Sequence, residues 1–499
     1  MTGVRPVPAT SVTTWDHEAD VVVAGYGVAG AAAAVEAAGA GADVLVLERA
    51  GAWGGAAALA GGFIYMGGGT GLQKACGFDD SAENMATFLN AAMGPGADRT
   101  RIADYCEGSV AHFEWLVACG VPFKPEFFGE PGWEPLGDQG LMYSGGEDAY
   151  PFNTVAEPAP RGHVPQMQNK KQGQASAGFM LMKPLVQKAT DLGVRALYDV
   201  RVQSLVVESD GRVTGITARQ YGTEVTIRAR RGVVLGTGSF AYNESMMNRF
   251  TPRIAGRPVS AVEQHDGQGI RMAQALGADL AHVDATEVAF LVDPQQLVRG
   301  ILVNSRGQRY VAEDTYPGRA GQLTLYHQED TAYLILDGDA QDEAVASQTP
   351  KLILRKPKWV CETVAELEAE IGLPFGSLQD TVARYNAAAA RGEDPLLHKK
   401  ARWLRPIGSP VGALDLRHAT GGFPLGGLRT TLDAQVLHVS GEPIPGLYAA
   451  GRCTAGLAAW GYASGISLGD GSFYGRRAGR SAARAQSFSS SPGNNRSGW

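Results

Sequence analysis

The feature that most constrains the fold is a strand, a glycine loop, a helix and a second strand that follow one another directly near the start of the chain. Asp20 opens the apolar run 21–24, and next come Gly25-Tyr-Gly27-Val-Ala-Gly30, an alanine-rich stretch over 31–40 and a second strand-like run over 43–48. An uninterrupted apolar strand is typical of a parallel sheet covered on both faces, and alanine favours helix. The pattern predicts a Rossmann-type βαβ unit and an α/β fold.

Each glycine of the loop has a mechanical task in such a unit. Gly25 makes the tight turn, Gly27 lets the backbone approach a pyrophosphate, and Gly30 lets the helix pack closely on the strand. The helix N-terminus at 28–29 then faces the phosphates. Glu48, about 20 residues after the loop, is expected to bind a ribose hydroxyl, and its charge disfavours the 2′-phosphate of NADP.

Three later glycine-rich landmarks separate FAD from NAD. The stretch from Arg49 to Gly62 follows Glu48 directly, a short strand ends in Gly236-Thr-Gly238, and Ala450-Gly451-Arg452 lies far downstream. NAD dehydrogenases do not need the first of these stretches, whereas a flavin is a ligand long enough to run beneath it. We therefore expect FAD, bound by a nucleotide domain that is discontinuous in sequence.

In this order the landmarks resemble the FAD-binding superfamily of fumarate reductases, succinate dehydrogenase flavoproteins and 3-ketosteroid dehydrogenases. The segments 266–278, 301–313 and 420–422 agree with it as well. The resemblance covers residues 17–485 and implies an α/β chain (α+β overall), with a discontinuous Rossmann-type FAD-binding domain over 17–299 and 410–485. A capping, catalytic domain is expected as an insertion over 300–409. The Ser/Gly/Asn-rich segment 486–499 is expected to be a disordered tail.

The motif positions also give the expected cofactor contacts. They are Gly25, Gly27, Val28, Ala29, Gly30, Glu48, Arg49, Gly54, Gly55, Ala56, Gly62, Val202, Gly236, Gly238, Ala450, Gly451, Arg452, Ser467 and Leu468. Succinate dehydrogenases carry a histidine after the second glycine pair to attach their flavin, and alanines stand at 56–58 here. The resemblance therefore implies non-covalent FAD.

One departure from the superfamily narrows the reaction. Fumarate reductases grip substrate carboxylates with a histidine and an arginine; His418 is kept here, but Tyr462 stands where the arginine belongs. Losing a bidentate cation removes the natural partner of a dicarboxylate. Arg319 is no convincing counterpart of the second family arginine, so a fumarate reductase is disfavoured.

The nearest resemblance is to the 3-ketosteroid Δ4-(5α)-dehydrogenases, through the segments 313–318 and 459–469. It implies the catalytic residues Tyr316, Tyr462 and Ser464, with an apolar ketosteroid as substrate. Tyr462 would donate a hydrogen bond to the C3 oxygen as an oxyanion donor does. Ser464 would lie near the α proton, and Tyr316 would relay that proton, because a serine hydroxyl alone is a poor base.

Alternatives remain open at this stage. A Δ1-dehydrogenase of the same family would carry Tyr-Pro-Gly-x-Gly in this region, whereas Ala463 follows Tyr462 here. A fumarate reductase-like flavoprotein is the other enzyme alternative. A non-catalytic flavin redox sensor is the third, because no electron-acceptor site can be identified from sequence.

Composition excludes several other classes. The formal charge is −7 without long Lys/Arg runs, which disfavours nucleic acid as a partner. No apolar stretch reaches the length of a membrane-spanning helix and no signal core opens the chain, so we expect a cytoplasmic protein. The histidines and cysteines show no metal-ligand spacing, so no metal is expected. The aromatic residues over 112–152 are expected either to wall the substrate pocket or to pack in the core.

Overall fold

The βαβ unit lies at the centre of the largest sheet of the protein, for which we describe a computed structural model covering residues 4–165, 177–347 and 353–487. The unit consists of β2 (His17–Ala24), α1 (Val28–Gly39) and β3 (Val44–Leu47). β2 and β3 pair in parallel, with Val21 opposite Val44. Both strands are apolar because helices cover one face of the sheet and further strands and loops cover the other.

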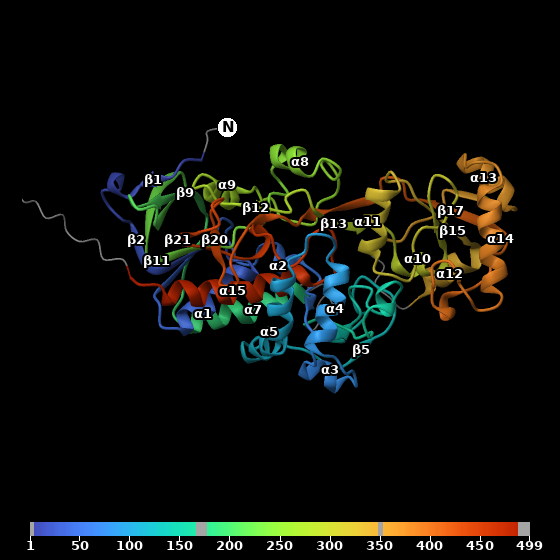
Figure 1. Cartoon of the computed structure of the whole chain (residues 1–499), viewed down its shortest axis with the longest axis horizontal. Coiled ribbons are helices and arrows are strands. Elements are labelled where there is room, and N and C mark those ends of the chain that lie inside the picture. The colour runs from blue at the N-terminus through green and yellow to red at the C-terminus, as the bar shows by residue number, and fades with distance from the viewer. Residues whose placement is uncertain (1–3, 166–176, 348–352, 488–499) are drawn as a thin grey trace, which may run out of the picture.

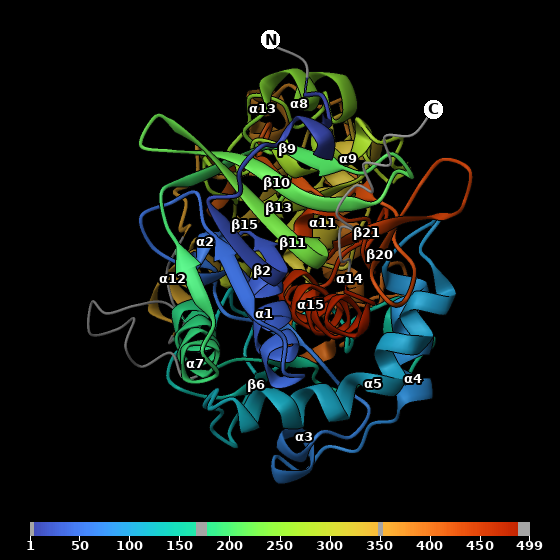
Figure 2. The same ribbon diagram turned by 90° about the vertical axis from the view of Figure 1, so that its left-hand side faces the viewer.

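Segments from both ends of the chain join this sheet. Among the described residues it has nine strands, and its order is β1-β9-β10-β11-β2-β3-β8, with β21 beside β11 and β20 beside β21. The remaining bounds are β1 (Val7–Pro8), β8 (Arg195–Leu197), β9 (Val200–Val207), β10 (Val213–Gln220), β11 (Thr223–Leu235), β20 (Gln435–Leu437) and β21 (Pro443–Ala449). The end of β11 pairs in parallel with both β2 and β21, so residues near 22, 234 and 448 lie side by side. Figure 2 shows β10, β11 and β2 of this sheet lying side by side.

The helices α1 and α15 (Ile466–Arg484) pack against each other beneath the sheet (Figure 2). A Cβ on Gly475 would lie 2.5 Å from the Ala29 carbonyl oxygen, and one on Gly479 would lie 2.1 Å from that of Ala33. Glycines facing alanines therefore let the two backbones touch. Because the contacts advance together along both helices, the helices run in the same direction, and both N-termini face the same edge of the sheet.

A second unit lies at the far end of the elongated molecule (Figure 1). In the described chain its sheet has four strands in the order β14-β15-β17-β16, namely β14 (Ile301–Val303), β15 (Tyr333–Asp337), β17 (Val411–Asp415) and β16 (Trp359–Cys361). Its helices are α10 (Pro294–Arg299), α11 (Pro317–His327), α12 (Gly338–Ala346), α13 (Val364–Ile371) and α14 (Ser377–Ala389). We call the residues between β13 and β18 the outer unit. The outer unit includes β17, which follows residue 409 in the sequence, because this strand pairs with both β15 and β16.

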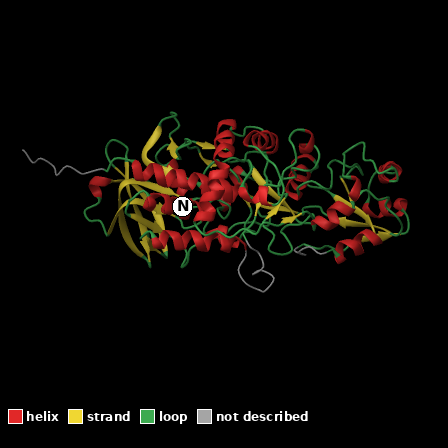
Figure 3. Cartoon of the chain, turned by 90° about the horizontal axis from the view of Figure 1, so that it is seen from below, coloured by secondary structure: helices red, strands yellow, loops and turns green. Residues whose placement is uncertain are grey.

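Two antiparallel strands connect the outer unit to the rest of the protein. β13 (Thr286–Phe290) pairs with β18 (Thr420–Pro424), with Glu287 opposite Phe423. Figure 3 shows the two groups of strands at opposite ends of the molecule, with helices and loops between them. The chain therefore enters and leaves the outer unit through one narrow pair of strands.

The remaining α-helices and strands of the described chain surround these two sheets. They are α2 (Gly55–Leu59), β4 (Ile64–Tyr65), α3 (Gly71–Ala75), α4 (Ala82–Ala92), α5 (Arg99–Ala118), β5 (Phe127–Phe128), β6 (Leu141–Met142), β7 (Gly162–His163), α7 (Ala177–Asp191), α8 (Glu244–Phe250), α9 (Gln268–Gln274), β12 (Leu280–Ala281) and β19 (Gly427–Leu428). Within the described ranges, no helix has the length and apolar character needed to cross a bilayer. The expected disordered tail lies almost entirely outside the described residues, which end at 487.

Candidate active site

A cavity of about 660 Å³ extends from the glycine loop to the edge of the outer unit. Its walls come from the loop after β2, the end of β3, α2, the start of β9, the loops after β11 and before α9, β13, and the first turn of α15. Both α1 and α15 direct their N-termini at it. Helix N-termini carry unpaired N–H groups and partial positive charge, so the cavity suits an anionic ligand.

The glycine loop has the backbone geometry that the sequence predicts. Gly25 has a φ of +100°, and a Cβ on it would lie 2.4 Å from the carbonyl oxygen of Gly236. A Cβ on Gly30 would lie 1.9 Å from the Gly25 carbonyl oxygen. Neither position accepts a larger residue without rearrangement. Glu48 fixes the loop, because its carboxylate accepts the N–H of Tyr26 at 2.7 Å and that of Ala50 at 2.8 Å.

Most of the residues expected to bind the cofactor line this cavity. They are Gly25, Gly27, Val28, Ala29, Glu48, Arg49, Gly55, Ala56, Gly62, Val202, Gly236, Gly238, Gly451, Arg452, Ser467 and Leu468. Gly30, Gly54 and Ala450 do not line it. Gly54 donates its N–H to the Tyr26 carbonyl at 2.9 Å, and Ala450 donates to that of Leu235 at 3.0 Å, so these residues support the wall from behind.

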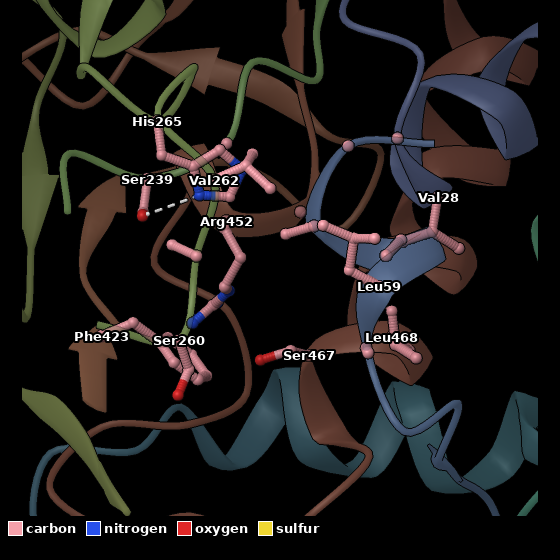
Figure 4. Close-up of a pocket in the computed structure, with 18 of the residues that line it drawn as sticks. Val28, Leu59, Ser239, Ser260, Val262, His265, Phe423, Arg452, Ser467 and Leu468 are labelled. Atoms are coloured by element: carbon pink, nitrogen blue, oxygen red, sulfur yellow. Dashed lines mark hydrogen bonds between the residues drawn. The ribbon is translucent and has the colours of Figure 1, made fainter. Parts of the chain in front are cut away.

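Arg452 gives the cavity a cation that has no partner in the described protein. Its Nε and Nη1 atoms are buried and donate a hydrogen bond to none of the described residues. Figure 4 shows its side chain in the pocket beside Ser260, across from Leu59 and Leu468. Burial lowers the pKa of the neighbouring His265 to about 4, with a further contribution from Arg452, so that imidazole is neutral. An unpaired buried guanidinium beside two helix N-termini fits an FAD molecule with its diphosphate.

Tyr462 stands at the start of α15 and projects into the cavity. Its hydroxyl donates to Ser467 Oγ at 2.9 Å and accepts the N–H of Ser467 at 3.3 Å. Its ring meets that of Phe423 edge-on, with 5.9 Å between centroids. Burial raises the pKa of Tyr462, so it is a neutral phenol that can donate a hydrogen bond.

Tyr316 and Ser464 reach the same cavity from two other directions. Tyr316 precedes α11, and its ring lies over Gly318, where a Cβ would clash with it. Ser464 is held by Ser144, whose carbonyl accepts the Ser464 N–H at 3.0 Å and whose hydroxyl donates to the Ser464 carbonyl at 2.9 Å. The hydroxyls of Tyr316 and Ser464 bond to no other residue in the described part of the chain. Both residues also line a smaller cavity of about 80 Å³ behind them.

Glu287 is a cavity residue that the sequence analysis missed. It lies on β13, is only 6% exposed, and its Oε2 has no hydrogen-bond partner among the described residues. Burial raises its pKa to about 8. The signal in the sequence is a single acid in the otherwise apolar strand Glu287-Val-Ala-Phe-Leu291, but sequence alone cannot tell which face of that strand meets a cavity.

Two other residues considered from sequence, His418 and Arg319, do not line the cavity. His418 is exposed and pairs with Asp330 at 2.8 Å, and Arg319 packs over the ring of Phe152 at 4.7 Å. Of the aromatic residues over 112–152, Trp133 lines the large cavity, whereas Phe128 and Tyr143 line only the small one. Most of the others pack in or against the hydrophobic core. Among the described residues, no group of His, Cys, Asp or Glu side chains could hold a metal ion.

Comparison with known proteins agrees with this geometry. Residues 20–468 match the FAD binding domain family. The crystal structure of 3-ketosteroid-Δ4-(5α)-dehydrogenase from Rhodococcus jostii RHA1, in complex with 4-androstene-3,17-dione, is 68% identical, has a TM-score of 0.95 and covers 96% of this chain and 100% of that chain. The 3-oxo-5-alpha-steroid 4-dehydrogenase of Comamonas testosteroni is 28% identical over 90% of this chain and 95% of its own length. A 3-oxosteroid 1-dehydrogenase of Mycobacterium tuberculosis is 27% identical over 88% and 93%.

Proposed function

Because the chain belongs to the FAD-binding family of flavoprotein oxidoreductases that includes the 3-ketosteroid-Δ4-(5α)-dehydrogenases, we propose that it introduces a C4–C5 double bond into 3-keto-5α-steroids. The observation that carries this proposal is the convergence of Tyr316, Tyr462 and Ser464 on one end of a cavity whose other end suits a dinucleotide. The protein is a steroid dehydrogenase that uses FAD.

Desaturation beside a ketone removes a proton from C4 and a hydride from C5. Bound FAD supplies the acceptor for the hydride. The chain itself must stabilise the negative charge that develops on the C3 oxygen. We assign this task to Tyr462, whose phenol is neutral and whose oxygen already accepts a backbone N–H at the positive end of α15.

The proton from C4 goes first to Ser464 in this proposal. A serine hydroxyl is a weak base and acts only when another group takes its own proton. Tyr316 is placed to do so, because it borders both cavities together with Ser464. Burial raises the pKa of Tyr316 well above its ordinary value, so Tyr316 passes protons as a neutral phenol.

The cofactor end of the cavity has its own assignments. Arg452 and the N-terminus of α1 would hold the diphosphate, and Glu48 would bind a ribose hydroxyl while keeping the glycine loop in place. The alanines at 56–58 provide no nucleophile, so we propose non-covalent FAD. We also propose that the outer unit is the capping domain, since Tyr316 reaches the cavity from it.

The test is to incubate the FAD-loaded protein with a 5α-reduced 3-ketosteroid and an artificial electron acceptor. The expected result is loss of flavin absorbance without acceptor, and a conjugated enone with acceptor. Mass spectrometry and NMR then locate the double bond. A product unsaturated between C1 and C2 would assign the chain to the Δ1 reaction instead, and no flavin reduction by any ketosteroid would contradict catalysis altogether.

A further inference from the structure

The side chains of β13 and of the residue that follows it alternate between two environments, as strand geometry requires. Glu287, Ala289 and Leu291 line the large cavity. Val288 and Phe290 point the other way and pack near Gly321 of α11, where a Cβ would lie 2.9 Å from the Phe290 Cβ. The only acid of this segment is therefore on the cavity side, enclosed by apolar neighbours. An unpaired carboxyl in such a place is costly for stability, which makes its position informative.

Both reactive tyrosines lie close enough to Glu287 to respond to its charge. A carboxylate at Glu287 raises the pKa of Tyr316 and of Tyr462, in each case adding to burial. Its Oε2 lies beside Gly422, where a Cβ would come within 3.1 Å of it. Glu287 thus lines the same cavity as Tyr316 and Tyr462.

The charged groups around β13 leave this carboxyl without a counter-ion. In the loop after α8, Arg257 pairs with Asp330 at 2.6 Å and donates to Thr420 of β18 at 2.7 Å. On α11, Arg319 lies over an aromatic ring. Arg452 acts on the pKa of Tyr462, but burial alone shifts that of Glu287. A carboxyl with a pKa near 8 exchanges its proton within the ordinary working range of an enzyme, which suits a general base.

We propose that Glu287 is the group that accepts the substrate proton from Tyr316. The inference rests on the proposed function. The C4–H bond breaks and its proton passes to Ser464 as the Ser464 proton passes to Tyr316. Tyr316 and Glu287 line the same cavity without a hydrogen bond between them, so water in that cavity carries the proton on: the Tyr316 O–H bond breaks, and a new O–H bond forms on the Glu287 carboxylate. Bound FAD would accept the electron pair of the C5–H bond as hydride, so substrate, relay and carboxyl balance, and Glu287 ends the step neutral.

Glu147 is the competing buried acid, and its geometry gives it another task. Burial raises its pKa to about 7, but Arg161 lowers it, and its Oε2 accepts the N–H groups of Ser144 and Gly145 at 3.2 and 2.8 Å. It lines neither of the two cavities described above. Glu147 therefore holds the loop that positions Ser464, and it does not face the tyrosines.

The first test is single-turnover reduction of the flavin by a 5α-reduced 3-ketosteroid between pH 6 and 10. In the wild type the rate should rise about tenfold per pH unit below about pH 8 and then level off, because Glu287 must be ionised to accept the proton. Glu287→Gln should lower the plateau by about 100-fold and remove this rise. Glu287→Asp should restore the rise. An unchanged pH profile in Glu287→Gln would overturn the proposal.

Glu147→Gln separates the two acids. This variant should react more slowly, because Glu147 holds the loop at Ser144, but its rate should still rise with pH up to about pH 8. If the rise is lost in Glu147→Gln and kept in Glu287→Gln, the role belongs to Glu147 and the proposal is disproved.

A second readout needs no steroid. Infrared difference spectra of the FAD-loaded protein should show a protonated carboxyl that titrates near pH 8 and is absent in Glu287→Gln. Failure of steroid turnover with this titration intact would contradict the proposed function alone, whereas absence of the titration would contradict this inference alone.

Discussion

The hydroxyl of Tyr462 makes two hydrogen bonds to Ser467. It donates to Ser467 Oγ at 2.9 Å and accepts the Ser467 N–H at 3.3 Å. Ser467 belongs to the first turn of α15, whose N-terminus carries partial positive charge. The helix therefore orients the phenol and stabilises negative charge that reaches its oxygen. The position that carries an arginine in fumarate reductases is here a neutral donor with a fixed direction.

Tyr462→Phe should lower kcat by about 100- to 1,000-fold, because it removes the hydroxyl that we propose donates to the developing charge on the C3 oxygen. KM for the steroid and the amount of bound FAD should change little, since the ring still packs edge-on against Phe423. Steady-state kinetics and the flavin-to-protein absorbance ratio measure these quantities. Turnover at the wild-type rate in Tyr462→Phe would show that another group polarises the ketone.

Gly30→Ala should destabilise the nucleotide domain by about 1–3 kcal/mol and reduce FAD binding, because the new Cβ would lie 1.9 Å from the Gly25 carbonyl oxygen. Gly39→Ala, in the same helix, is the matched control. A Cβ there meets nothing within 4 Å, so it should be neutral or stabilise by up to about 1 kcal/mol. Thermal unfolding and bound flavin report both variants. Equal stability of the two would contradict the close approach of helix and loop.

Arg452→Leu should weaken FAD binding by about 10- to 100-fold, which corresponds to a hydrogen bond with a charged group of about 1.5–3 kcal/mol. The reason is that its buried Nε and Nη1 have no partner in the described protein and are available to the cofactor. The FAD affinity of Arg452→Lys should lie between those of the wild type and Arg452→Leu, because lysine keeps the charge but lacks the planar guanidinium group. Titration of apoprotein with FAD, followed by flavin fluorescence, gives the dissociation constants. Unchanged affinity in Arg452→Leu would place the cofactor elsewhere.

Arg309→Met should destabilise the outer unit by about 3–5 kcal/mol, because it leaves the buried Asp394 carboxylate without its cation and Glu313 with Lys399 alone. The Arg309 guanidinium bonds to Glu313 at 2.7 and 2.9 Å and to Asp394 at 2.9 and 3.1 Å, with all three side chains buried. Arg384→Met is the control with the same spacing. Its exposed pair with Asp380 should contribute less than about 1 kcal/mol.

The same ion network predicts a dependence of stability on pH. Burial raises the pKa of Glu313, but Arg309 and Lys399 outweigh burial and hold it below the ordinary value of 4.5. A depressed folded-state pKa contributes stability above the unfolded value, and this is lost as pH falls through the folded value. The free energy of unfolding of the wild type, measured with denaturant, should therefore fall on acidification below pH 4.5, and it should fall less in Arg309→Met. Parallel pH curves for the two proteins would contradict this assignment.

Much of the nucleotide site could be predicted from sequence, because the determinants are local. Alternation of apolar strand, glycine loop and alanine-rich helix indicates the βαβ unit within 30 residues, and the glycines at 25 and 30 stand where the structure allows no Cβ. The FAD prediction is confirmed by the family match, and the steroid dehydrogenase prediction by the 68% identical structure. The roles of Tyr316, Tyr462 and Ser464 stay predictions, although the fold brings all three to one cavity.

What only the tertiary structure decided depends on contacts between distant segments. The pairing of β17 with β15 and β16 carries the outer unit past residue 409, and the Gly475–Ala29 contact packs the start of α1 against the middle of α15. Glu287 looks like an ordinary acid in sequence. Its position becomes significant only when the fold buries it in one cavity with Phe423, Tyr316 and Tyr462, from three other segments. Local periodicity determines which elements form, whereas desolvation is a property of the assembled packing, and desolvation is what shifts the pKa of that carboxyl.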